Sequence, residues 1–150
     1  MSAGEISMEK IIAYATEKHA GQFRRDEVTP YIEHPLRVMR KLQEKFPTRP
    51  ILHILGVLHD VLEDTDATEE ELKVLGLSGH TIRSLKRLTH NKGEPYRDYI
   101  SRIGRDPNAR KVKLADIFDN ITDSPTEKQF NKYIKAYSLL LIFESGEIDA

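Results

Sequence analysis

The sequence contains no cysteine among its 150 residues. Disulfide bonds and thiolate metal sites are therefore excluded, and any metal ion must be held by histidine, aspartate or glutamate. A chain without cysteine is compatible with the cytoplasm, where we expect this protein to reside. The sequence also lacks an apolar run of roughly 18 residues, the length of a membrane span, and its first residues lack the basic and apolar regions of a signal peptide. We therefore expect no membrane partner.

The sequence has little net charge. Its formal charge is −1, with 31% charged and 39% hydrophobic residues. This composition is typical of a globular protein rather than a disordered one. A near-neutral chain lacks the general basic surface of a nucleic-acid-binding protein, so we expect no nucleic-acid partner. The composition leaves a homo-oligomer open.

Strand-like alternation of apolar and polar residues is missing, and helical spacing of apolar residues runs through most of the chain. Apolar groups surround most of the segment 51–64, which favours a helix at the centre of the fold. Thr68 and Glu71 have the spacing of a capping box at the start of a short helix over 69–75. Further helices are expected within 76–89, 108–123 and 127–146. The sequence predicts a single all-α domain over residues 1–150, a bundle of about seven or eight helices.

The predicted central helix carries acidic and imidazole groups in "VLHDVLEDTD", residues 57–66. His59 and Glu63 are four residues apart, as are Asp60 and Asp64, so each pair lies along one helix face. Burying ionised carboxylates without partners costs several kcal/mol each. A bound cation would offset this cost. The alternative is a helix end that emerges into water, which suits Asp64 better than the apolar-flanked pair of His59 and Asp60.

Two other polar residues lie in apolar or proline-flanked segments and extend the candidate site. His34 precedes a proline in "YIEHPL", and Asp116 lies in "VKLADIFDN". With His59 and Asp60 they make a set of two histidines and two carboxylates, which suits Mn²⁺, Fe²⁺ or Zn²⁺. Such an ion can lower the pKa of a bound water and supply a nucleophile. The sequence spacing allows this grouping without requiring it.

The order of the motifs resembles a known family. "KHAGQFRR", "PYIEHPLRV", "LHDVLEDTD", "LTHNKGE", "YRDYISRI" and "VKLADIFDN" follow one another between residues 8 and 123. This series is similar to the HD hydrolase domain of the RelA/SpoT family, and the length resembles its single-domain members, the small alarmone hydrolases. The resemblance implies an HD-type helical bundle. It also implies hydrolysis of the 3′-pyrophosphate of ppGpp or pppGpp, giving GDP or GTP and pyrophosphate.

The resemblance also implies roles for individual residues. It implies one Mn²⁺, with other divalent ions possible, held by His34, His59, Asp60 and Asp116. Glu63 and Asp64 match the acidic pair that orients or deprotonates the attacking water. The matches to groups that contact the nucleotide or its phosphates are Arg24, Arg25, Asn120 and Lys113. Without the resemblance, the two arginines read as solvated loop charges, Asn120 as a local packing or capping group, and Lys113 as a surface lysine.

The sequence departs from the family pattern at two positions near these motifs. Glu27 stands where members commonly have glycine, which alone adopts positive φ at low cost. Ile117 stands where members often have arginine or lysine. These changes leave open an adenine alarmone such as ppApp, or another nucleotide, as the substrate of an HD-type phosphohydrolase. A third alternative is a module that binds alarmones without hydrolysing them.

Overall fold

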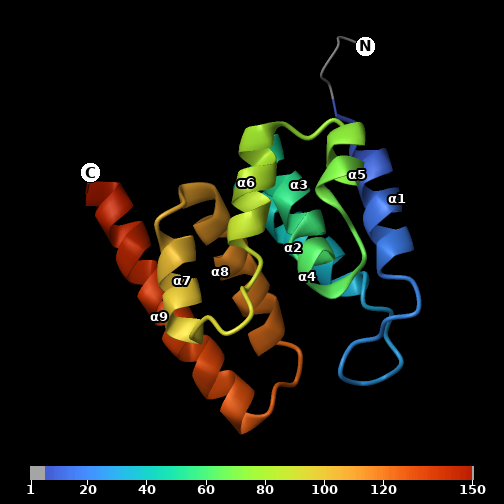
Figure 1. The fold of residues 1–150 in the computed structure, drawn as a ribbon. Coiled ribbons are helices and arrows are strands. Elements are labelled where there is room, and N and C mark those ends of the chain that lie inside the picture. Colours follow the sequence, from blue (N-terminus) through green and yellow to red (C-terminus); the bar gives the residue numbers. More distant parts are fainter. Residues whose placement is uncertain (1–5, 150) are drawn as a thin grey trace.

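The computed structural model describes residues 6–149. This part of the chain is helical (Figure 1). The helices are α1 (Met8–Lys18), α2 (Glu33–Lys45), α3 (Pro50–Leu58), α4 (Val61–Asp64), α5 (Glu69–Val74), α6 (Gly79–Arg87), α7 (Tyr96–Gly104), α8 (Pro107–Ile121) and α9 (Glu127–Asp149). The described residues form no strand, and their only bridge pairs Phe23 with Pro30. The predicted all-α fold is confirmed.

The predicted central helix is divided into α3 and the single turn α4, with His59 and Asp60 between them. His59 Nδ1 lies 2.7 Å from the Gly56 carbonyl oxygen. In an unbroken helix that oxygen would accept from the Asp60 N–H, four residues further on. The His59 imidazole therefore donates to the carbonyl oxygen that would accept the next backbone hydrogen bond of a continuous helix. The interruption turns both side chains toward one point in the interior.

The helix α3 lies at the centre of the fold, as predicted. Residues 52–58 are all buried, and α3 packs against α1, α2, α6 and α8. Its contact with α2 is close at Gly56, where an added Cβ would come 2.9 Å from Leu42 Cδ1 and 3.2 Å from Met39 Cα. A larger residue at this position would push the two helices apart.

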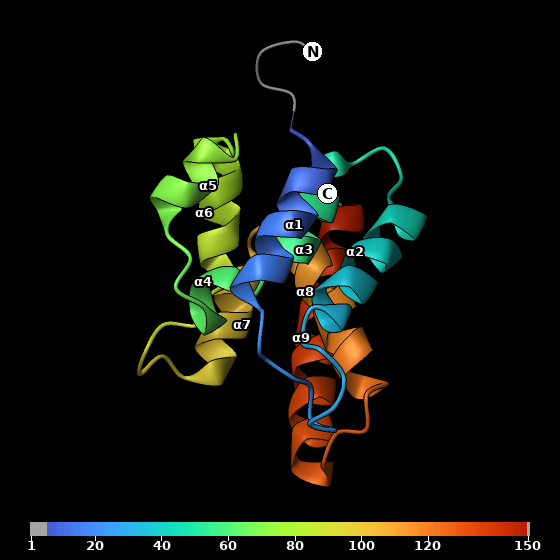
Figure 2. The same cartoon turned by 90° about the vertical axis from the view of Figure 1, so that its right-hand side faces the viewer.

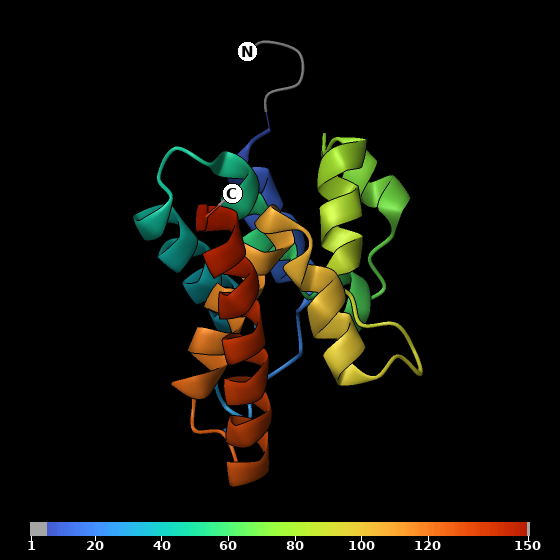
Figure 3. The same cartoon turned by 90° about the vertical axis from the view of Figure 1, so that its left-hand side faces the viewer.

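The second long element of the interior is α8, which packs against α2, α3, α6, α7 and α9. It begins at Pro107, and the Asp106 carboxylate accepts from the backbone N–H groups of Asn108 (3.0 Å) and Ala109 (3.1 Å). This N-cap satisfies donors that a helix start leaves unpaired. Figures 2 and 3 show α9 running along the outside of the bundle, beside α7 and α8.

Local sequence signals set several helix ends. The predicted capping box of Thr68 and Glu71 is present at the start of α5. Ser7 caps α1, and Ser78 caps α6. None of the helices in the described range combines the length and apolar character needed to cross a bilayer.

Candidate functional site

Four potential metal-binding side chains from three parts of the chain converge in the interior. His34 comes from the first turn of α2, His59 and Asp60 from the junction of α3 and α4, and Asp116 from α8. His34 Nε2 lies 2.9 Å from Asp116 Oδ1 and 3.3 Å from His59 Nε2. His59 Nε2 lies 3.0 Å from Asp60 Oδ2 and 3.3 Å from Asp116 Oδ1. The structure therefore brings together the four residues that the sequence suggested as ligands.

Each histidine has its outer ring nitrogen engaged. His34 Nδ1 lies 2.6 Å from Asp119 Oδ2, and His59 Nδ1 lies 2.7 Å from the Gly56 carbonyl oxygen. Both partners are acceptors, so each Nδ1 carries a hydrogen. In the neutral imidazoles the Nε2 lone pairs then face the shared centre. A carboxylate or carbonyl on the far nitrogen is the usual support for a metal-binding histidine.

The spacing of the donors fits a six-coordinate ion. With bonds of about 2.1 Å, neighbouring ligand atoms of an octahedral ion are about 3 Å apart. The two histidine Nε2 atoms lie 2.9 to 3.9 Å from each other and from the carboxylate oxygens of Asp60 and Asp116. Nitrogen and carboxylate donors suit an ion of intermediate hardness. The chemistry and geometry of the donor set thus fit a divalent transition metal.

The charges of the cluster stabilise one another. Burial raises the pKa of Asp60, but His59 lowers it by more, so it lies below its usual range. Burial lowers the pKa of the His59 imidazole, but the carboxylates of Asp60 and Asp116 raise it by more, so it lies well above its ordinary value. Burial raises the pKa of Asp116, but Lys113 and His59 lower it well below the usual range. Both carboxylates are therefore ionised at neutral pH, and they face imidazole nitrogens from which a metal would displace any proton.

The acidic pair Glu63 and Asp64 lies one turn beyond the cluster, on α4, and both residues line the same pocket. Glu63 Oε1 accepts from the His90 backbone N–H at 2.6 Å. Burial raises the pKa of the Asp64 carboxyl to about 6, and the charges of Asp60 and Glu63 contribute. A carboxyl with a pKa near neutrality is suited to accept a proton from water.

The cluster opens into a pocket of about 670 Å³. A volume of this size accommodates a nucleotide-sized ligand. His34, Asp60 and Asp116 line one part of it, and the other lining residues include Arg24, Arg25, Tyr31, His90, Tyr96, Tyr99, Lys113, Asn120, Lys132 and Tyr133. Cations and aromatic rings thus surround the candidate metal centre, which suits a ligand with both phosphates and a base.

Arg24 is part of a built pocket wall and not a solvated loop charge. It is 8% exposed, and its guanidinium lies over the Tyr31 ring at 5.4 Å from the centroid. Arg24 Nε donates to Asp123 Oδ2 at 2.8 Å and Nη2 to Asn120 Oδ1 at 3.0 Å. Arg25 donates to the Asp123 carbonyl oxygen and to Asn120 Oδ1, the latter at 3.3 Å. The alternative of freely solvated charges is therefore wrong for Arg24.

Asn120 and Lys113 both contact the candidate ligand Asp116. Asn120 Nδ2 donates to Asp116 Oδ1 at 2.9 Å, and Lys113 Nζ donates to Asp116 Oδ2 at 2.8 Å. The Lys113 side chain is 14% exposed and lies over the Tyr99 ring at 5.2 Å. The alternative of Lys113 as a surface lysine is wrong. Both residues line the pocket next to the metal ligands.

Three residues that support the ligands, directly or through a neighbour, were not predicted from the sequence. Asp119 holds His34 Nδ1, and Arg37 in turn donates to Asp119 at 2.8 Å and 3.1 Å. Burial raises the pKa of Asp119, but His34 and Arg37 lower it to about 2. The Tyr31 hydroxyl donates to Asp60 Oδ2 at 2.5 Å. Asp119 follows Asp116 by three positions, one helical turn, and this spacing was the available signal.

The two departures from the family pattern have structural accounts. Glu27 has φ of 62°, so the loop keeps a left-handed residue at the position where glycine is expected. Its N–H donates to the Arg24 carbonyl oxygen at 2.9 Å. Ile117 is 1% exposed and belongs to the core, so this position of α8 contributes packing instead of a charge.

Comparison with known proteins finds related sequences and a related fold. Guanosine-3′,5′-bis(diphosphate) 3′-pyrophosphohydrolase of Aquifex aeolicus is 35% identical over 121 residues, 76% of this chain. The corresponding Danio rerio enzyme, MESH1, is 36% identical over 120 residues, 75% of this chain. A solved structure described as a metazoan ortholog of SpoT that hydrolyses ppGpp matches with a TM-score of 0.73 and 26% identity, covering 95% of this chain and 86% of that one.

The matched segments are only part of the two related sequences. They span 17% of the Aquifex aeolicus protein and 66% of the Danio rerio protein. No family model matches the chain.

Proposed function

We propose that this chain, which belongs to the RelA/SpoT-type family of HD hydrolases, removes the 3′-pyrophosphate from guanosine tetra- or pentaphosphate, giving GDP or GTP and pyrophosphate. The observation that carries the proposal is a cluster in which the Nε2 atoms of His34 and His59 lie 2.9–3.9 Å from each other and from carboxylate oxygens of Asp60 and Asp116, in a pocket with a basic wall. The two related enzymes, which are named for this reaction, support it.

In the proposed site, the four converging residues hold one divalent ion, and we propose Mn²⁺ because the donor set mixes imidazole and carboxylate. When bound, such an ion supplies Lewis acidity and lowers the pKa of water at the site. His34 and His59 present their Nε2 atoms because Asp119 and the Gly56 carbonyl oxygen fix the other nitrogen. These supports hold the ligands in place before the ion arrives.

In the proposed reaction, water attacks the phosphorus bonded to the ribose 3′ oxygen. The new P–O bond replaces the bond to the 3′ oxygen, pyrophosphate leaves, and the 3′ oxygen takes a proton from solvent to become a hydroxyl. Asp64 accepts a proton from the attacking water, and its pKa of about 6 keeps it ionised at neutral pH. Glu63, held by the His90 N–H at 2.6 Å, orients the same water. Arg24, Arg25 and Asn120 position the nucleotide, and Lys113 offsets phosphate charge beside Asp116.

The test is incubation of purified protein with ppGpp and Mn²⁺, followed by separation of nucleotides and measurement of pyrophosphate. The proposal predicts equimolar GDP and pyrophosphate, and no products after removal of the metal with a chelator. A protein that binds the metal and releases no pyrophosphate would contradict it. Parallel reactions with ppApp distinguish a guanine from an adenine alarmone. Tight binding of ppGpp without turnover would favour the module that binds without hydrolysing.

We extend the proposal to four wider properties of the protein. Residues 1–150 form one HD-type domain, in line with a single core cluster that joins α1 to α9. The proposed location is the cytoplasm, with which a chain without cysteine is compatible. It needs no nucleic-acid partner, because its formal charge is only −1. A homo-oligomer is compatible with this function, and gel filtration of the purified chain would establish the oligomeric state.

A further inference from the structure

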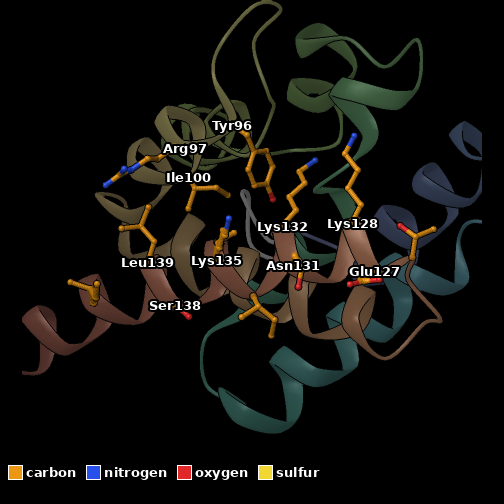
Figure 4. Close-up of a pocket in the computed structure, with 14 residues that line it drawn as sticks. Tyr96, Arg97, Ile100, Glu127, Lys128, Asn131, Lys132, Lys135, Ser138 and Leu139 are labelled. Carbon is orange, nitrogen blue, oxygen red and sulfur yellow. The ribbon is translucent and has the colours of Figure 1, made fainter.

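A second hollow adjoins the candidate active site. It has a volume of about 1230 Å³ and lies between α7 and α9 (Figure 4). Tyr96 and Lys132 line both this groove and the pocket around the metal ligands. These two side chains therefore stand between the pocket around the metal ligands and the groove.

The groove is strongly basic. Its lining includes four cations and one anion, namely Arg97, Lys128, Lys132, Lys135 and Glu127. Lys128, Lys132 and Lys135 follow one another at intervals of four and three residues, so they share one face of α9. Like charges at this spacing destabilise a helix unless an anion lies between them. Such a stripe on a free helix is usually a solvated surface, but this one borders a groove floored by Ile100 and Leu139.

Of the cations in the groove, Lys132 is the one that also lines the pocket around the metal ligands. Its Nζ lies 4.1 Å from the centroid of the Tyr96 ring. Figure 4 shows Lys128 and Lys132 extending from the same side of α9, with Tyr96 of α7 beside Lys132. Among the described residues, neither lysine forms an ion pair with a carboxylate. Burial lowers the pKa of the Lys132 ammonium, and the charge of Lys113 lowers it further.

The cations thus form a path that starts at the metal centre. Lys113 lies 2.8 Å from Asp116 Oδ2, Lys132 lines both hollows, and Lys128, one helical turn away on α9, lines the groove alone. The charges of Lys113 and Lys128 lower the pKa of Lys132, and the charge of the Glu63 carboxylate raises it. Lys113 already has a carboxylate partner, whereas the outer two do not. Their unpaired charge suits a polyanion that reaches out from the site.

We propose that Lys132 and Lys128 form a second anion subsite that binds the 5′-phosphates of the nucleotide while its 3′-pyrophosphate lies at the metal centre. This inference rests on the proposed function, because it assigns the two ends of the same substrate. A nucleoside 3′,5′-bis(diphosphate) has two phosphate groups separated by a ribose, and the site has two centres for anions. The subsite makes affinity depend on the number of 5′-phosphates.

The test compares three substrates that share the 3′-pyrophosphate and carry one, two or three 5′-phosphates. KM and kcat are measured with Mn²⁺ for wild type, Lys132→Gln, Lys128→Gln and the matched surface control Lys10→Gln. We expect wild-type KM to fall with each added 5′-phosphate. In Lys132→Gln and Lys128→Gln this fall should shrink, with KM for the triphosphate raised about fivefold, as expected for one partly screened charge pair. The kcat should stay within about twofold.

An increase in KM that is equal for all three substrates, or no increase, would overturn the subsite. Lys132→Arg should restore the dependence, which separates charge from packing against Tyr96. The affinity of the manganese-loaded protein for GDP, measured by calorimetry, tests the subsite without hydrolysis. Weaker GDP binding in both Gln variants supports the subsite even if wild type hydrolyses no alarmone, whereas unchanged GDP binding contradicts it.

Discussion

The Asp119 carboxylate lies 2.6 Å from Nδ1 of His34, on the far side of the imidazole from the candidate metal centre. Arg37 holds the same carboxylate from a second direction. The contact fixes both the tautomer and the orientation of the ring. The geometry makes Asp119 a positioning residue for a ligand, although it touches neither the proposed ion nor the nucleotide.

Replacement of Asp119 by Asn should weaken metal binding by about 10- to 100-fold, because the neutral amide supports His34 less strongly. The measurement is Mn²⁺ affinity by calorimetry. Asp98→Asn on the exposed side of α7 is the matched control and should leave the affinity unchanged. Equal affinities for wild type and Asp119→Asn would show that the contact does not support metal binding.

Replacement of His59 or Asp116 by Ala should abolish metal binding, since each removes one of four donors and leaves its neighbours unpaired. Metal binding is coupled to folding, so both variants should also lose the thermal stabilisation that Mn²⁺ confers on wild type. Metal analysis after dialysis and melting curves with and without Mn²⁺ check this. A variant that retains one equivalent of metal would remove that residue from the ligand set.

Asp106, the N-cap of α8, should make the free energy of unfolding depend on pH. Burial raises the pKa of Asp106, but the N–H of Ala109 and the side chains of Arg87 and Ser84 lower it by more, so it lies below its ordinary value. A depressed folded-state pKa stabilises the fold above the unfolded-state pKa, and this contribution is lost as the pH falls through the folded-state value.

Asp106→Asn should therefore lower the free energy of unfolding by about 1–2 kcal/mol at pH 7. The difference from wild type should shrink below about pH 4. Urea denaturation at several pH values measures both. A difference that stays constant down to pH 3 would mean that the charge of Asp106 contributes nothing to stability.

Substitution of Glu27, which has a strained backbone, by glycine should stabilise the fold, whereas substitution of Asp106 destabilises it. Its φ of 62° suits glycine, so Glu27→Gly should raise the free energy of unfolding by up to about 1 kcal/mol. Glu27→Ala keeps the Cβ and should give no such gain, which makes it the control for loss of charge. Denaturant melts of the three proteins compare them. Stabilisation by Ala equal to that by Gly would indicate relief of charge repulsion instead of strain.

The sequence allowed the helical class, the central position of residues 52–58 and the capping box at Thr68 to be predicted, because each depends on local spacing. It did not predict the break between Leu58 and Val61. At that break the His59 side chain lies within hydrogen-bond distance of the Gly56 carbonyl oxygen. Periodicity alone cannot distinguish such a bond from a continuous helix.

The candidate ligands could be named from sequence, but their support could not. His34 and Asp119 are 85 positions apart in the sequence, and only the packing of α2 against α8 brings them together. Likewise, Arg24 and Lys113 looked like surface charges because their partners, Asp123 and Tyr99, meet them only in the folded chain. Long-range contacts decided these roles, and a single sequence does not contain them.

In the proposed mechanism, four ligands hold an ion while Asp64 takes the proton from the water. The most direct test measures Mn²⁺ content and pyrophosphate release from ppGpp together, in wild type and Asp64→Asn. We predict about one equivalent of metal in both proteins, and a rate in the variant lower by about 10²- to 10⁴-fold. Full metal occupancy with equal rates in the two proteins, or no release from either, would contradict the account.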